Sequence, residues 1–127
     1  MDKTALVTES PVVDIQDFYK SYKKQPAVID LTLTIQRGEI YGLIGPDGAG
    51  KSSLMKAIAG VLAFEQGKLE VFGVTIDSEA AAERIKGRLG FMPQGLGLNL
   101  YGDLSVEENI DFFAQLREVK PAQLAER

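Results

Sequence analysis

The stretch that decides the fold is Gly45-Pro46-Asp47-Gly48-Ala49-Gly50-Lys51-Ser52. It matches the pattern G-x-x-x-x-G-K-[ST], in which a glycine-rich loop joins a strand to a helix and binds phosphate groups. An apolar run over residues 40–44 predicts the strand, and residues 52–59 predict the helix. Backbone N–H groups of the loop and of the first helical turn would then point at phosphate oxygens.

The residue types in this loop fit a nucleoside triphosphate with Mg²⁺. A Cβ at Gly45, Gly48 or Gly50 would obstruct the close approach or the positive φ that such a loop requires. Lys51 offers a positive charge to the β- and γ-phosphates, and the Ser52 hydroxyl is placed to ligate Mg²⁺. The candidate ATP-binding residues of this segment are Gly45, Pro46, Asp47, Gly48, Ala49, Gly50, Lys51, Ser52 and Ser53.

The overall composition excludes several classes of partner and of functional site. The 127 residues suit one domain, and the net charge of −4 argues against a nucleic-acid partner, since phosphate backbones attract basic surfaces. The sequence contains neither cysteine nor histidine, which excludes disulfides, thiolate metal sites and histidine general bases. No apolar run approaches the ~20 residues of a membrane-spanning helix.

The first third of the chain predicts two antiparallel strands after a loose lead-in over residues 1–10. One strand begins at Val12 and ends near Tyr22, and residues 23–26 form a turn. From residue 30 to 36 apolar residues alternate with threonines, as expected for a half-buried strand of period two.

The remainder alternates between helices and short strands. Strands are expected over 69–72 and 89–93, and helices are expected from the N-cap Ser78 to residue 86 and after Ser105, whose S-x-x-E sequence is a capping box. Pro121 fits the first turn of a last helix. Apolar residues at helical spacing on the helix after Ser105 predict a core face: Val106, Ile110, Phe113 and Leu116.

Three motifs, taken in order, resemble the ATP-binding domain of an ABC transporter. They are Tyr22, which lies 29 positions before Lys51; the phosphate loop, preceded by the R-G-E turn of residues 37–39; and the F-M-P-Q sequence ending at Gln94, 43 positions after Lys51. The segment 101–109 is similar to the "L-T-V-x-E-N" helix start of that family. The sequence of the phosphate loop looks most like that of bacterial multidrug or ABC-2-type exporters.

This resemblance implies an α/β fold of the P-loop NTPase type. It would comprise an antiparallel β lead-in, the phosphate-loop strand and helix, the Q-loop strand and the start of a helical subdomain. ATP and Mg²⁺ are the implied cofactors. Tyr22 would stack on adenine, Val28 or the neighbouring Ala27 would touch the same base, and Gln94 would join Ser52 at Mg²⁺. Asp47 departs from the neutral residue common there and is expected to point out of the loop.

The implied partners are a transmembrane permease subunit or domain and a second ATP-binding domain, on the cytoplasmic face of the inner membrane. Residues of the loop at 95–101 and the helix after it would face the permease, with four candidate contacts: Leu96, Leu98, Leu100 and Tyr101. No nucleic acid is expected.

The sequence lacks three features of the family: the L-S-G-G-Q signature, a Walker B strand ending in Asp-Glu, and the switch histidine. We therefore expect residues 11–127 to be a partial ATP-binding domain, cut from a longer ATPase, that binds ATP without hydrolysing it and holds no catalytic residue. The strands at 40–44 and 89–93 would lack their neighbours in the family's sheet. This favours marginal stability or strand exchange with a second copy.

Other functions remain open at this stage. A soluble ABC-type ATPase not tied to a permease is the nearest alternative. A small kinase or GTPase would share the phosphate loop, although no N-K-x-D guanine motif is present. A non-enzymatic module that only binds a nucleotide or a partner is the third.

Overall fold

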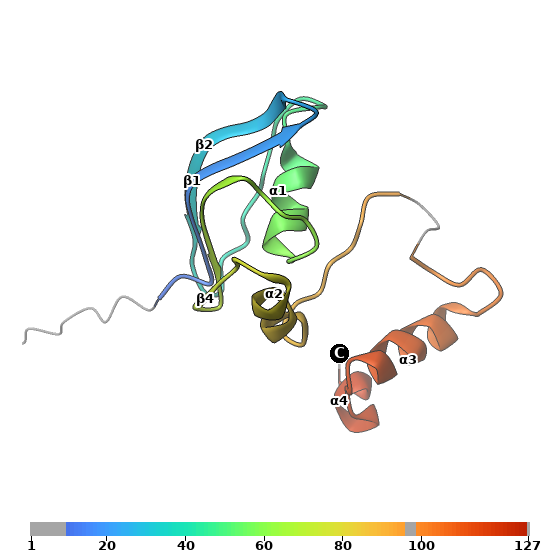
Figure 1. Cartoon of the computed structure of the whole chain (residues 1–127). Coiled ribbons are helices and arrows are strands. Elements are labelled where there is room, and N and C mark those ends of the chain that lie inside the picture. Colours follow the sequence, from blue (N-terminus) through green and yellow to red (C-terminus); the bar gives the residue numbers. More distant parts are fainter. Residues whose placement is uncertain (1–9, 96–98, 127) are drawn as a thin grey trace, which may run out of the picture. The chain divides into compact units, whose positions relative to one another are not determined.

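The computed structural model describes residues 10–95 and 99–126. The lead-in over residues 1–9 and the two leucines at positions 96 and 98 lie outside the described residues. The chain divides into two compact units, the first ending at Gly90 and the second beginning at Phe91 (Figure 1). None of the helices in the described ranges is long and apolar enough to cross a membrane.

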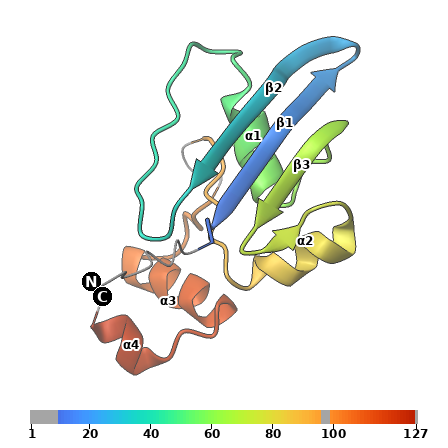
Figure 2. The same ribbon diagram turned by 90° about the vertical axis from the view of Figure 1, so that its left-hand side faces the viewer.

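The first unit is a four-stranded antiparallel sheet with two helices. Its strands are β1 (Val13–Tyr22), β2 (Gln25–Ile35), β3 (Gln66–Val71) and β4 (Val74–Thr75), in the order β2-β1-β3-β4. Helix α1 (Lys51–Ile58) follows the phosphate loop, and α2 (Glu79–Lys86) follows β4. The expected antiparallel lead-in is therefore confirmed, and Figure 2 shows β2, β1 and β3 side by side.

The hairpin between β1 and β2 closes through Lys23 and Lys24. Both residues have positive φ, 48° and 67°. Positive φ at both central residues is the conformation whose twist matches that of paired strands, although glycine and asparagine are the residues that usually adopt it. The tight turn fixes the end of the hairpin, where Tyr22 lies.

A β-bulge at Asp17 explains the uneven apolar spacing of β1. Asp17 has a φ of 51°, and its amide donates a 3.0 Å hydrogen bond to the hydroxyl of Thr32. Pairing with β2 shifts between Ile15 and Phe18, so the buried positions change from odd to even residues along the strand. Gly67 on β3 makes room for this bulge, since a Cβ there would lie 2.5 Å from the Asp17 carbonyl oxygen. The bulge therefore places Phe18 and Lys20 on the buried side.

The core of this unit lies between the sheet and the two helices. Its largest fully buried side chains are Phe18, Ile15, Leu69, Ile85 and Val71. From α1, Leu54 and Ala57 join the same cluster, so α1 is held against the sheet by its apolar face.

The strands expected over 40–44 and 89–93 do not form in this structure. In the described residues all ladder pairing is among β1, β2, β3 and β4, and both segments are irregular (Figure 2). The side chains of Ile40 and Ile44 are almost fully exposed, at 101% and 96%. A strand is stabilised by ladder hydrogen bonds to a neighbour, and no described segment pairs with either run.

The second unit contains α3 (Val106–Leu116) and α4 (Pro121–Ala125). The capping box of Ser105 and Glu108 is confirmed, with hydrogen bonds in both directions. Bonding from the Ser105 amide lowers the pKa of the Glu108 carboxyl.

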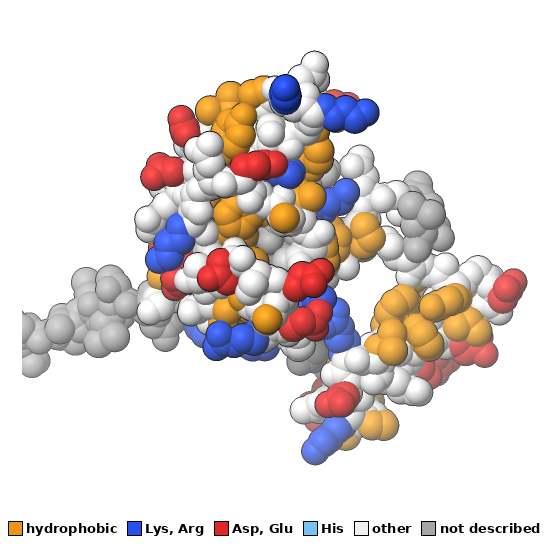
Figure 3. Space-filling view, in the orientation of Figure 1, with side chains coloured by type: hydrophobic (Ala, Val, Ile, Leu, Met, Phe, Trp, Pro, Cys, Tyr) orange, Lys and Arg blue, Asp and Glu red, His pale blue; other side chains and the backbone are white. Residues whose placement is uncertain are grey.

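The predicted core face of α3 is wrong, because its four side chains are exposed, from 39% at Phe113 to 79% at Val106. The helix buries Asn109 and Ala114 instead. Asn109 holds the preceding loop, accepting from the Tyr101 amide and donating to the carbonyls of Tyr101, Leu104 and Ser105. Figure 3 shows hydrophobic side chains gathered on the visible face of this unit.

Candidate functional site

The start of α1 differs from the starts of α2 and α3 in two respects. Serines at positions 78 and 105 cap α2 and α3 by accepting backbone amides, whereas α1 begins after Gly50, which has no side chain to offer. The first turns of α2 and α3 carry glutamates, and the first turn of α1 carries no acidic residue. The first N–H groups of a helix have no partner within it and carry partial positive charge, so this start favours an external anion.

Two glycines shape the loop before α1. Gly48 and Gly50 have φ of 82° and 89°, a region that side chains rarely adopt. A Cβ at Gly50 would also lie 2.5 Å from the Ala27 carbonyl oxygen and 2.6 Å from Val28 Cγ2, so the loop packs closely on β2. Gly45 has neither feature; its added Cβ would meet Ala49 at an ordinary 3.4 Å.

The ammonium of Lys51 lies over the loop. Its Nζ donates to the carbonyl oxygen of Pro46 at 2.7 Å and to that of Gly45. The amide of Ala49 also donates to the Pro46 carbonyl, at 3.2 Å, which closes the turn. The Asp47 side chain is exposed. These contacts place the positive charge of Lys51 on the loop, which also carries the exposed carboxylate of Asp47.

Tyr22 reaches the same region from the end of β1. Its hydroxyl lies 2.9 Å from the hydroxyl of Ser53 in the first turn of α1, and the residue stays 46% exposed. Figure 1 shows the end of the β1–β2 hairpin beside the start of α1. The structure thus brings Tyr22, Val28 and the phosphate loop together. Val28 is only 9% exposed and lies under Gly50, so little of it is open to a ligand.

The two predicted Mg²⁺ ligands lie in different units. Ser52 is exposed at the start of α1, and Gln94 is exposed in the second unit. The role of Gln94 at Mg²⁺ therefore stays a prediction. Leu100 and Tyr101 are 64% and 52% exposed, which leaves their predicted interface role open to test.

An ion pair next to Tyr22 was not predicted from the sequence. Lys20 is only 9% exposed, and its Nζ lies 2.9 Å from Glu65 Oε1, while Glu65 Oε2 accepts the Ser21 amide at 3.1 Å. The same Nζ lies 5.0 Å from the centre of the Tyr22 ring. The hydrogen bond from Lys20 lowers the pKa of the Glu65 carboxyl. Phe18, Lys20 and Tyr22 follow one another at a spacing of two residues, which is the spacing of side chains on one face of a strand. This relation can be inferred from the sequence only if the position of the bulge is known.

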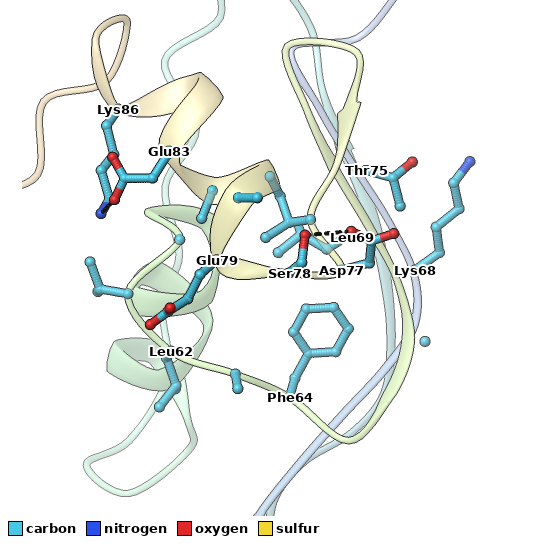
Figure 4. Close-up of a pocket in the computed structure, with 17 residues that line it drawn as sticks. Leu62, Phe64, Lys68, Leu69, Thr75, Asp77, Ser78, Glu79, Glu83 and Lys86 are labelled. Atoms are coloured by element: carbon cyan, nitrogen blue, oxygen red, sulfur yellow. Dashed lines mark hydrogen bonds and ion pairs between the residues drawn. The ribbon is translucent and has the colours of Figure 1, made fainter.

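A separate cavity of about 800 Å³ lies in the first unit (Figure 4). Its lining residues fall between Gly60 and Lys86, so it does not include the phosphate loop. Leu62, Phe64 and Leu69 contribute apolar surface, and Asp77, Glu79 and Glu83 contribute carboxylates. Glu83 is paired with Lys86.

Comparisons with known proteins identify the family. Residues 28–127 match the family model described as ABC transporter. The chain is 45% identical over 96 residues to the probable multidrug ABC transporter ATP-binding protein YbhF of Escherichia coli, covering 75% of this chain and 16% of that protein. It is 36% identical over 115 residues to the Nod factor export ATP-binding protein I of Rhizobium meliloti, covering 89% of this chain and 33% of that protein.

Solved structures give the same answer for the fold. A putative ABC transporter ATP-binding protein from Pyrococcus furiosus superposes with a TM-score of 0.71 at 30% identity, over 85% of this chain and 50% of that one. The structure of an ATP-binding subunit of an ABC transporter gives a TM-score of 0.72 at 27% identity, over 87% and 45%. This chain therefore belongs to the ABC transporter family and has the fold of the N-terminal part of its ATP-binding domains.

Proposed function

We propose that residues 11–127 form part of an ATP-binding domain that binds Mg²⁺-ATP at the loop before α1 and, within a whole ATPase, powers export across a membrane. The observation that carries the proposal is the start of α1. It has neither a side-chain cap nor an acid in its first turn, it follows two glycines of positive φ, and Lys51 lies over it. An oxyanion would satisfy those amides and that charge together.

Each predicted residue has a role in this proposal. Backbone N–H groups of the segment from Gly45 to Ser53, in which Pro46 has none, hold the phosphates. Lys51 pairs with the phosphate charge, and Tyr22 covers the base with Val28 behind it. Ser52 and Gln94 would hold Mg²⁺, which would neutralise phosphate charge. The positive-φ glycines and the absence of an acid in the first turn of α1 fit such a group.

Turnover is not proposed for this chain. Its sequence contains no Asp-Glu pair and no histidine to position or activate a water molecule. Phosphoryl transfer depends on such positioning and on charge stabilisation, so we infer binding without hydrolysis.

The proposed partners are a transmembrane permease and a second ATP-binding domain, at the cytoplasmic face of the inner membrane. Export is supported by the names of the multidrug and Nod factor relatives. The exposed side chains of Leu100 and Tyr101 are candidate permease contacts, and the exposed run at 40–44 is a candidate for strand exchange with a second copy.

Calorimetric titration with ATP and, separately, with inorganic tripolyphosphate tests the binding proposal. Lys51→Ala should weaken the binding of both ligands about 10- to 150-fold, since a hydrogen bond to a charged group contributes about 1.5–3 kcal/mol. Lys56→Ala is the matched control, because Lys56 is exposed in the last turn of the same helix. Equal affinities in the wild type and Lys51→Ala would contradict the proposed site.

A further inference from the structure

The side chain of Lys20 is buried, charged and directed at an aromatic ring. Its exposure is 9%, and burial of an ammonium is unfavourable unless the charge is compensated. Glu65 compensates it with a contact of 2.9 Å, and the other oxygen of Glu65 is fixed by the Ser21 amide. The ammonium is therefore held from two sides, by a carboxylate and by the face of Tyr22 at 5.0 Å.

Tyr22 is in turn fixed at two points. Its hydroxyl is bonded to Ser53, and its ring is attracted to Lys20. One end of this arrangement is on the loop before β3, and the other is in the first turn of α1. Because the residue is still 46% exposed, ring surface remains open to solvent.

From this geometry we propose that Lys20, anchored by Glu65, is a positioning residue that sets the Tyr22 ring for the purine base of the nucleotide. This inference rests on the proposed function. A ring that is already fixed loses less conformational freedom when a base stacks on it. A cation near one face also draws electron density from the ring, which favours stacking of an electron-rich purine on the other face.

A purely structural role for the ion pair predicts something different. A buried pair adds little stability over a well-packed apolar residue, so an apolar replacement of similar length should be tolerated. Such a replacement would then leave nucleotide binding unchanged, or would weaken every ligand equally by loosening the fold. The positioning role predicts that only ligands with a base are affected.

The test compares ATP with inorganic tripolyphosphate, which has no base, by calorimetric titration of the 127-residue chain. Lys20→Met should weaken ATP about two- to fivefold relative to tripolyphosphate, which is the range of a cation–π contact. Glu65→Gln should shift the ratio in the same direction, and Lys20→Arg should restore it. Tyr22→Ala should lower ATP affinity by about 5- to 150-fold and leave tripolyphosphate unchanged.

Lys68→Met is the matched control. Lys68 also pairs with a glutamate on the sheet, Glu70, at 3.2 Å. Its substitution should leave the ratio of ATP affinity to tripolyphosphate affinity unchanged. Thermal melting of each variant verifies folding, and Glu65→Gln, at a side chain 42% exposed, remains informative if Lys20→Met unfolds.

The outcomes separate the two proposals. A selective loss of ATP affinity in Lys20→Met or Glu65→Gln supports positioning. An unchanged ratio, or equal weakening of both ligands, overturns it while the proposed ATP site stands. A wild-type chain that binds neither ligand overturns the proposed function and the positioning role with it.

Discussion

The close packing of the phosphate loop on β2 predicts that two similar glycine substitutions will have different effects. Gly48→Ala and Gly50→Ala both place a side chain at a left-handed φ, 82° and 89°. That conformation costs a non-glycine residue about 1–2 kcal/mol. At Gly48 the new methyl group meets nothing within 4 Å, so the cost should end there.

At Gly50 the methyl group would overlap with β2. It would lie 2.5 Å from the Ala27 carbonyl oxygen and 2.6 Å from Val28 Cγ2, where a comfortable contact is about 3.5–4 Å. Ala27 contributes backbone, which cannot rotate away as a side chain can. Forcing such a group into a packed site costs a further 1–3 kcal/mol or so. The expected total for Gly50→Ala is therefore about 2–5 kcal/mol of unfolding free energy.

Urea denaturation followed by far-ultraviolet circular dichroism measures the difference. Small domains have slopes of about 1–3 kcal/mol per molar urea, so Gly50→Ala should lower the midpoint clearly more than Gly48→Ala. If the two variants lose the same stability, the loop does not pack on Ala27 and Val28 as described. A loss confined to Gly48→Ala would refute the reasoning outright.

Three other predictions concern caps, loops and pH. Ser105→Ala should cost the second unit about 0.5–2 kcal/mol by removing the α3 cap, and unchanged melting of that unit would argue against the capping box. Asn109→Ala should lower the unfolding free energy of the second unit by about 2–3 kcal/mol, since the Asn109 side chain makes four hydrogen bonds to the segment before α3. Hydrogen exchange at the Tyr101 amide should become faster, and unaltered protection of that amide would contradict this role of Asn109. Lys20 lowers the pKa of the Glu65 carboxyl below its ordinary 4.5, so the ionised carboxylate stabilises the folded state at neutral pH, and this contribution is lost as the pH falls below 4.5. The wild type should therefore lose more unfolding free energy than Glu65→Gln between pH 6 and pH 3. Parallel stability profiles of the two proteins would refute the coupling.

Local features of the fold could be predicted from the sequence because they depend on a few neighbouring residues. The caps at Ser78 and Ser105 are examples, since each joins a side chain to an amide three residues later. Helix α1 and the β1–β2 hairpin were also predicted, from helical and alternating periodicity.

The errors concern features that depend on distant partners. The run at 40–44 has the composition of a strand, but a strand forms only beside another, and none is paired with it in the described residues. The apolar face of α3 was expected to be buried, but periodicity says nothing about what covers a face, and Val106 is 79% exposed. At the candidate site, the phosphate loop can be predicted from its motif alone. Predicting the Lys20–Glu65 pair requires knowledge of the bulge and of a contact between residues 45 positions apart.

The start of α1, which has no side-chain cap and no acid in its first turn, has a practical consequence for handling the protein. Any small tetrahedral oxyanion should settle among those amides and the Lys51 ammonium, whether or not it carries an adenosine. Sulfate or phosphate in a purification buffer would then act as a competitor, and apparent nucleotide affinities would depend on the buffer salt even at fixed ionic strength. Chloride with an amine buffer is the appropriate starting condition for every titration described above.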